Sequence, residues 1–233
     1  MALPKIDLPI SELELPSTKE KVRYRPFTVK EEKILLVAAE SGDPKQELLA
    51  ARQIVNNCLI DREVSDLAMF DLEYILLILR ARSVDNSVMF EIKDPDTRET
   101  VQLELNIDKV EIKRDPSHTN QVRVNDDYIL YLKYPTIDEF AQIVKMDPKD
   151  PLVNYYIMVS CLDKIASEDE VHLFSEYTQD ETDEFMEGMP GEVIKGVQTF
   201  FETMPKLRHE MKYKNNEGKE QTFVVEGMRS FFS

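Results

Sequence analysis

The chain has 233 residues, of which 42% are hydrophobic, and its 45 acidic against 29 basic side chains give a formal charge of −16. This length and hydrophobic content are enough for one large domain or two small ones with a packed core. The charge disfavours nonspecific binding to nucleic acid or anionic lipid, which would be repelled, and favours basic partners. No apolar run approaches the roughly 20 residues of a membrane span, and the N-terminus lacks a signal-peptide layout. We therefore expect a globular, cytosolically made protein with no nucleic-acid or membrane partner.

Residues 1–18 are predicted to form an extended N-terminal arm. Its prolines prevent it from forming a helix, yet it is too apolar to be a tail that is free in solvent. Its apolar candidates for partner binding are Leu3, Ile6, Leu8, Ile10, Leu13 and Leu15. Two alternatives stay open: the arm docks on another protein, or it packs against its own domain.

Residues 21–41 combine a strand with a helix. Val22 and Tyr24 alternate with charged residues, which is typical of a half-buried strand. Thr28 and Glu31 have the spacing of a capping box, in which each side chain bonds to the backbone N–H of the other residue. A helix is therefore predicted to begin at Thr28. Asp43 and Pro44 then provide the cap and first residue of a second helix.

A third helix is predicted from Leu67 to Ala81, where apolar residues form two stripes that should both be buried. In residues 88–92 and 101–105 every second residue is apolar, which is typical of β-strands. Two such strands on either side of Asp94 and Pro95 predict a hairpin. Residues 115–120 are polar and are expected to link two halves of the chain.

The second half repeats this order. Residues 131–144 again combine strand-like residues and a proline with Thr136 and Glu139 at capping-box spacing. A helix over 192–203 and a hairpin from 209–213 and 221–225 complete the correspondence. Further matches are Asp43-Pro44-Lys45 with Asp147-Pro148-Lys149, and Cys58-Leu59 with Cys161-Leu162. Chance similarity is the alternative, because capping boxes are common.

The predicted fold class is α+β, with two similar halves that arose by internal duplication. Each half is expected to hold an antiparallel hairpin or small sheet packed with about three helices. The predicted division is an arm over 1–18, a first repeat over 19–120 and a second repeat over 121–233. The two cysteines, Cys58 and Cys161, are expected to be buried thiols rather than a disulfide.

The segment from Glu168 to Glu192 contains ten acidic residues and no Lys or Arg. It is either a solvated acidic face or a docking surface for a basic partner. The acidic candidates for partner binding are Glu168, Asp169, Glu170, Asp180, Glu181, Asp183 and Glu184.

Catalytic motifs are missing from the sequence. The three histidines, His118, His172 and His209, lie far apart and have no second His or Cys at metal-ligand spacing. The sequence also lacks a Gly-rich phosphate loop and a nucleophile elbow. We therefore expect no enzyme, no catalytic residue, no metal and no cofactor.

Three stretches carry a resemblance to a known family: KVRYRPFTVKEEKILLVAAESGD from Lys21, FDLEYILLILRARSV from Phe70, and EGMRSFF near the C-terminus. In these stretches the chain resembles the baseplate hub assembly proteins of T-even-type contractile-tailed bacteriophages. The resemblance implies a non-enzymatic assembly factor or hub component that binds other baseplate hub or tail proteins. It also implies a location in the host cytoplasm during assembly and in the tail baseplate of the virion.

The resemblance further bears on the last hairpin, where some relatives carry cysteine pairs as in small zinc ribbons. This chain has Met211, Tyr213 and Asn216 there, so the hairpin must be held by packing. The alternative to the hub role is a general acidic adaptor or chaperone for a basic or aggregation-prone partner. The sequence leaves the oligomeric state open.

Overall fold

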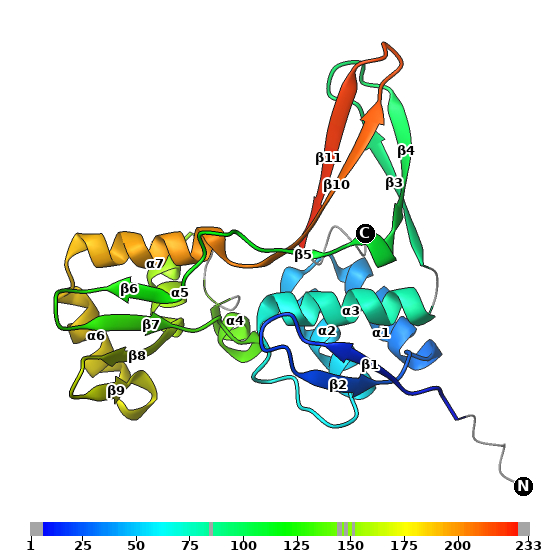
Figure 1. Cartoon of the computed structure of the whole chain (residues 1–233). Helices are drawn as coiled ribbons and strands as arrows, with labels where there is room; N and C mark the ends of the chain where they lie inside the picture. Colours follow the sequence, from blue (N-terminus) through cyan, green and yellow to red (C-terminus); the bar gives the residue numbers. More distant parts are fainter. Residues whose placement is uncertain (1–6, 84–85, 144–145, 147–148, 151, 228–233) are drawn as a thin grey trace, which may run out of the picture. The chain divides into compact units, whose positions relative to one another are not determined.

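The chain forms two compact units in a computed structural model, which describes residues 7–83, 86–143, 146, 149–150 and 152–227 (Figure 1). Unit 1 comprises residues 1–113 and 206–233, and unit 2 comprises residues 114–205. Unit 2 is thus an insertion within unit 1. The predicted domain boundary at residue 120 is close to residue 113, where the chain passes from unit 1 to unit 2. The prediction that all later residues form the second domain is wrong, because the last hairpin belongs to unit 1.

The two ends of this insertion are held together by strand pairing. Strand β5 (Ile112–Lys113) pairs antiparallel with the start of β10 (Lys206–Lys214), with Lys113 opposite Lys206. Leu207 of β10 is fully buried in the core of unit 1. The chain therefore leaves and re-enters unit 1 on neighbouring strands, a geometry that accommodates an inserted domain.

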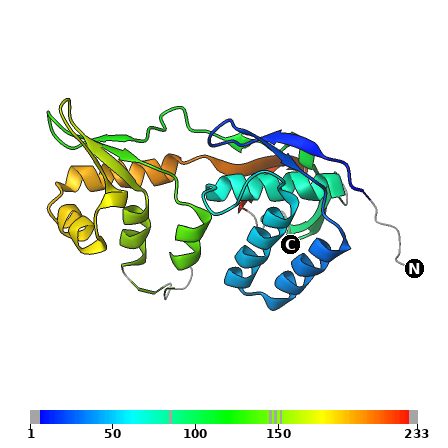
Figure 2. The same ribbon diagram turned by 90° about the horizontal axis from the view of Figure 1, so that it is seen from below.

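The helical part of unit 1 follows the predicted capping signals. The Thr28 capping box is present at the start of α1, and Asp43 accepts a hydrogen bond from the backbone N–H of Lys45 at the start of α2. Gly42 lies between the two helices at φ 63°, a conformation that favours glycine. Figure 2 shows α1 and α2 side by side with α3 across their ends. The bounds are α1 (Val29–Ser41), α2 (Pro44–Cys58) and α3 (Met69–Ser83).

Helix α3 is the central helix of unit 1. Leu72, Ile75, Leu76, Leu77 and Leu79 are all fully buried, and they point to more than one side of the helix. The prediction of a helix buried on both sides is confirmed. Most of the free energy of such a helix comes from this packing.

Two hairpins lie together in unit 1 and extend away from its helices (Figure 1). The strand bounds are β3 (Ser87–Lys93), β4 (Thr100–Asn106), β10 (Lys206–Lys214) and β11 (Glu220–Glu226), with the short helix η1 (Ile107–Lys109) after β4. Both predicted hairpins are confirmed. Their facing sides share one core, which includes Val88, Leu105, Met211 and Val225.

The tips of the two hairpins are joined through Asp94. Its carboxylate accepts hydrogen bonds from the Tyr213 hydroxyl at 2.8 Å and from the Thr97 backbone N–H at 2.8 Å. The side-chain amide of Asn215 lies 3.5 Å from the same carboxylate. Packing and this carboxylate hold the last hairpin, as the missing cysteines led us to expect.

Unit 2 is built on a four-stranded antiparallel sheet in the order β6-β7-β8-β9. Helix α7 packs against β6, where an added Cβ on Gly196 would come within 2.5 Å of Val122, so this approach requires glycine. The elements are β6 (Gln121–Arg123), β7 (Ile129–Leu132), α4 (Ile137–Ile143), α5 (Val153–Ser160), β8 (Leu162–Ala166), β9 (Val171–Leu173), η2 (Phe174–Glu176), α6 (Gln179–Glu187) and α7 (Gly191–Thr203).

The predicted α+β class is confirmed, with helices and small antiparallel sheets in both units. The expectation that the last hairpin packs with the helices of its own half is wrong, because the hairpins of both halves share the core of unit 1. The matched tripeptide at 147–149 falls partly outside the described residues. The duplication itself stays a prediction.

Candidate partner-binding surfaces

The N-terminal arm becomes part of unit 1 from Ser11 onward. Strand β1 (Ser11–Glu14) pairs antiparallel with β2 (Lys21–Tyr24), with Leu13 opposite Val22. Leu13 and Leu15 are both buried. The turn between the strands is held to α3, because the backbone N–H of Ser17 donates to Asp71 at 2.9 Å.

The candidate residues of the arm therefore have different environments. Leu13 and Leu15 belong to the core of their own unit, in agreement with the alternative of self-packing. Leu8 is half-buried and Ile10 is 59% exposed. Leu3 and Ile6 lie outside the described residues. Only the first part of the arm is left for the predicted docking role.

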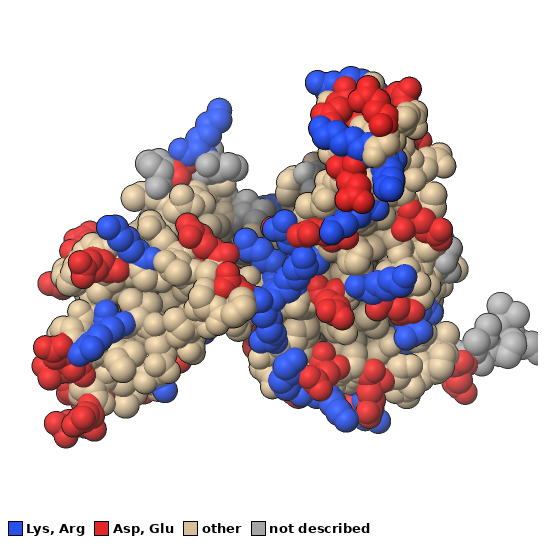
Figure 3. Space-filling model, turned by 45° about the horizontal axis from the view of Figure 1, so that its top comes forward, with Lys and Arg blue, Asp and Glu red and all other residues tan. Residues whose placement is uncertain are grey.

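The acidic candidates lie on two neighbouring pieces of unit 2. Glu168, Asp169 and Glu170 form the turn between β8 and β9, and the other four lie on α6. Most are exposed, but Asp183 is half-buried and accepts hydrogen bonds from Tyr155 and Gln179. Figure 3 shows acidic side chains along one edge of unit 2, at the left of the view.

Helix α6 begins with a third capping box, formed by Thr178 and Glu181. The backbone N–H of Thr178 donates to the Glu181 carboxylate and lowers its pKa, with a further contribution from the Thr178 hydroxyl. This helix was missed by the sequence analysis, although its Thr-x-x-Glu spacing is the signal used for the other two boxes. Burial raises the pKa of Tyr155 to about 12, and the hydrogen bond to Asp183 adds to the effect.

A cavity of about 630 Å³ opens beside these acidic residues, between the β6–β7 and β8–β9 ends of the sheet and helix α6. Its apolar wall includes Ile165, Phe174, Phe185 and Met189. The Phe174 and Phe185 rings pack with centroids 5.4 Å apart. We call this cavity the unit 2 pocket. Its volume lies within the range of about 300–1,000 Å³ that is usual for ligand sites.

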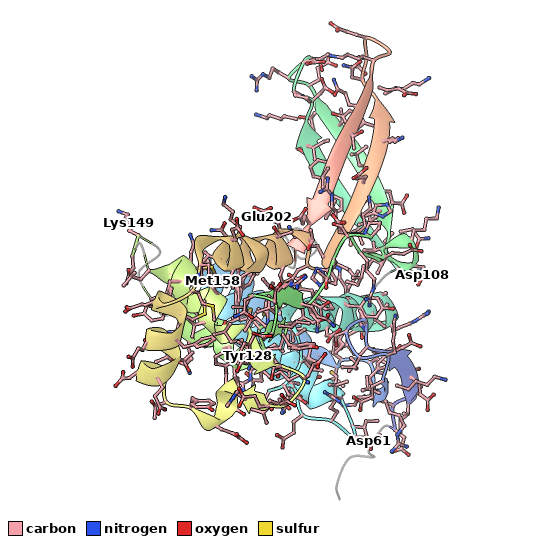
Figure 4. All side chains as sticks on the ribbon, turned by 60° about the vertical axis from the view of Figure 1, so that its left-hand side comes forward. Asp61, Asp108, Tyr128, Lys149, Met158 and Glu202 are labelled. Atoms are coloured by element: carbon pink, nitrogen blue, oxygen red, sulfur yellow. The ribbon has the colours of Figure 1, made fainter. Side chains whose placement is uncertain are left out.

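Hydrogen bonds connect the polar side chains at the edge of the unit 2 pocket. The Tyr128 hydroxyl donates to Glu170, and Nδ1 of His172 lies 2.7 Å from the Tyr177 hydroxyl. Nε2 of His172 lies 3.4 Å from the Glu170 carboxylate. The Tyr128 hydroxyl is the main cause of a lowered Glu170 pKa, while Glu170 raises the pKa of Tyr128. Tyr128 is labelled in Figure 4.

The sequence analysis found the acidic residues at this place and missed the aromatic ones. Phe174, Tyr177 and Phe185 alternate with the acidic residues of the segment. Large apolar residues inside an otherwise charged stretch were the available signal. They show that the segment is not a uniformly solvated face.

A second apolar surface lies between α1 and α2 of unit 1. Leu36 and Val37 are 58% and 67% exposed, and Leu49 is 44% exposed. A groove of about 460 Å³ runs beside Val37 and Leu49. Its polar lining consists of Lys33, Gln46 and Gln53.

The other titratable candidates have structural positions. His118 lies between the Thr203 hydroxyl at 2.9 Å and the Tyr134 hydroxyl at 3.0 Å, and its ring stacks on Phe200. Cys58 and Cys161 are free and buried, and burial raises their pKa values to about 11 and about 12. Over the described ranges, no group of three or more His, Cys, Asp or Glu side chains could hold a metal ion. A search of the same ranges finds no helix long and apolar enough to cross a membrane.

The two units thus define a mixed α+β protein with exposed apolar and acidic surfaces suited to binding other proteins. Comparison with known families makes the assignment specific. The chain matches the family described as T4 bacteriophage base plate protein over residues 8–233, and it belongs to that family. No significant match was found among curated proteins or among solved structures. The protein therefore has a structural or assembly role in a phage baseplate, where it interacts with other baseplate or tail proteins.

Proposed function

We propose that the protein acts in the central hub of the baseplate, as an assembly factor or structural component that works by binding rather than catalysis. The observation that carries this proposal is the family match over residues 8–233. The three stretches that resemble hub assembly proteins support the hub as the place of action. Its partners would then be other hub or tail proteins.

The chemistry of the side chains supports binding rather than catalysis. The thiols of Cys58 and Cys161 have raised pKa values and are buried, which is the reverse of an activated nucleophile. Burial lowers the pKa of His118, whose two ring nitrogens already contact Thr203 and Tyr134. The exposed features are apolar surfaces and the acidic segment, and both suit protein recognition.

Mass spectrometry of purified baseplates and of their hub intermediates tests this proposal. A hub component should be found in finished baseplates in a fixed ratio to the other hub proteins. An assembly factor should be bound to an unassembled hub protein and absent from finished tails. The hub proposal is wrong if phage lacking this chain still assemble complete hubs at the normal rate.

A further inference from the structure

The unit 2 pocket has an apolar wall that is fixed by the core behind it. Ile165 is buried, and Phe174, Phe185 and Met189 are half-buried side chains that pack directly on the core of unit 2. Since each of them contacts core residues on one side and lines the pocket on the other, the cavity is formed before any partner binds. Preformed apolar pockets bind with a smaller entropic cost than surfaces that must be ordered.

The edge of the pocket is fixed as well. The chain of contacts from Tyr128 through Glu170 and His172 to Tyr177 ties the β6–β7 turn to the β8–β9 turn and to the start of α6. Thr182, which is buried, donates to the Thr178 carbonyl within the first turn of α6. Val171 and Leu173, which are 57% and 38% exposed, alternate with His172 along β9 and so lie on the other face of the strand.

On the side formed by the acidic segment, the charge at the opening has one sign. Residues 167–193 contain ten Asp or Glu and no Lys or Arg. Glu181 lines the pocket, and Glu184 is exposed on the same helix. Glu170 accepts a hydrogen bond from the lining residue Tyr128 and lies next to the ring of the lining residue His172. Because the Glu170 and Glu181 carboxylates both have lowered pKa values, they stay charged at neutral pH. An apolar cavity with carboxylates along one side favours a ligand that combines apolar side chains with a cationic flank.

We propose that the unit 2 pocket is the docking site for a segment of another baseplate protein that inserts bulky apolar side chains between flanking Lys or Arg residues. This inference rests on the proposed function, since it names the chemistry of the partner. The carboxylates steer the basic residues to the opening, and burial of the apolar side chains against Phe174 and Phe185 holds the segment.

Other occupants fit the charge less well. An acidic segment or a phosphate group would be repelled by the carboxylates. A second copy of this chain would bring its own net charge of −16 to an acidic opening. A neutral apolar ligand would make no use of the carboxylates. These occupants are separated from the proposed one by the experiment below.

The test uses the full-length protein and three synthetic peptides, with binding measured by isothermal titration calorimetry. The first peptide places Phe and Leu between Lys residues, the second has Glu in place of each Lys, and the third has Ser in place of each Phe and Leu. The first should bind and the other two should not. Equal binding of the Lys and Glu peptides, or retention of full affinity by the Ser peptide, would overturn the proposal.

Pocket variants show whether binding occurs at this site. Phe185→Ala should weaken the Lys peptide about tenfold or more, because it removes a central apolar contact. Phe201→Ala is the matched control, since Phe201 is half-buried on the same core but does not line the pocket. Peptide NMR shifts that map onto α1 and α2 instead of the pocket would also overturn the proposal.

Charge variants test the role of the carboxylates. The double change Glu170→Gln and Glu184→Gln should weaken the Lys peptide about two- to tenfold, with less effect in high salt. Glu40→Gln on α1 and Glu202→Gln on α7, where Glu202 is labelled in Figure 4, make the same charge change outside the acidic segment. Equal losses in the two double variants would mean that only net charge matters, against a docking site.

Self-association is measured on the same samples by sedimentation velocity. If the protein dimerises and Phe185→Ala abolishes the dimer, the pocket binds a second copy and the proposal is wrong. This outcome leaves the hub assignment untouched, because the presence of the chain in baseplates is measured separately.

Discussion

Nη2 of Arg25 lies 3.1 Å from Oε1 of Glu31, an ion pair that joins the end of β2 to the first turn of α1. The Glu31 side chain is only 1% exposed, and it also accepts hydrogen bonds from the backbone N–H and hydroxyl of Thr28. One carboxylate therefore both caps the helix and fixes its angle to the preceding strand.

Lys133 and Glu139 make the equivalent contact in unit 2, at 2.6 Å. In each unit the cysteine at the end of the next helix accepts a backbone hydrogen bond from the basic residue of this ion pair. The Arg25 backbone N–H donates to the Cys58 carbonyl at 3.0 Å, and the Lys133 N–H donates to the Cys161 carbonyl at 2.7 Å. These contacts correspond in the two units around the two capped helices, and the duplication itself stays a prediction.

Replacing Glu31 by Ala should destabilise unit 1 by about 3 kcal/mol, because a buried carboxylate and its ion pair are lost together. Glu139→Ala should cost less, about 1 kcal/mol, since Glu139 is 29% and Lys133 41% exposed. Urea unfolding of the two variants gives both values. Equal losses would contradict the importance assigned to the burial of Glu31.

The Glu31 carboxylate should also make unit 1 sensitive to acid. Burial alone would raise its pKa, but hydrogen bonds from Arg25 and Thr28 outweigh burial and lower the pKa to about 2. Since the folded pKa is below the ordinary value of 4.5, the stabilisation is complete above pH 4.5 and is lost as the pH falls towards 2. Glu31→Gln should flatten the dependence of the free energy of unfolding on pH in this range. An unchanged pH profile would contradict the shifted pKa.

The sequence predicted the elements that local signals define. Capping boxes at Thr28 and Thr136, the Asp43 cap and the period of two around Asp94 all correspond to observed helices and strands. Helix α6 and strands β8 and β9 were missed. The strands are short. Residues 168–192 were interpreted from their acidic composition, and the Thr178 capping box within them was therefore overlooked.

The assembly of the two units depends on contacts that no local pattern contains. Tyr213 and Asp94 are 119 residues apart in sequence and meet at the hairpin tips. The pairing of Lys113 with Lys206 likewise closes a loop that encloses all of unit 2. The same reason applies to the candidate site: the acidic residues were found from composition, whereas the pocket exists only when the β6–β7 turn, β8 and α6 come together.

Leu77→Asp should unfold unit 1. Leu77 is fully buried in the cluster shared by α3 and both hairpins, so the new carboxylate would be an unpaired buried charge. Circular dichroism should show loss of the cooperative melting transition of unit 1. Leu36→Asp on α1 is the control, because Leu36 is 58% exposed and should change stability by no more than about 0.5 kcal/mol. A normal melting profile for Leu77→Asp would exclude α3 as the core helix.

Asp94→Ala should release the two hairpin tips from each other. The Thr97 backbone N–H is the main cause of an Asp94 pKa lowered to about 2, and the Tyr213 hydroxyl contributes further. Hydrogen exchange should therefore become faster at the amides of Asp96 and Thr97 and around Asn215. Asp96→Ala should have a smaller effect, since its partners Lys219 and Gln221 lie on the surface. Similar exchange in both variants would mean that the tips are held by the apolar core alone.

Deleting residues 1–16 should lower the melting temperature markedly, because it removes β1 and the buried side chains of Leu13 and Leu15. Truncating Leu15 alone to Ala should cost about 2–5 kcal/mol, whereas Ile10→Ala, at a 59% exposed position, should cost almost nothing. Deleting residues 1–10 keeps β1 and should leave the melting temperature unchanged. If this shorter variant still loses partner association, the first part of the arm is a docking segment, and the strand β1 that follows it is structural. If removal of residues 1–16 leaves the melting temperature unchanged, β1 does not complete the sheet, and the assignment of Leu13 and Leu15 to the core is wrong.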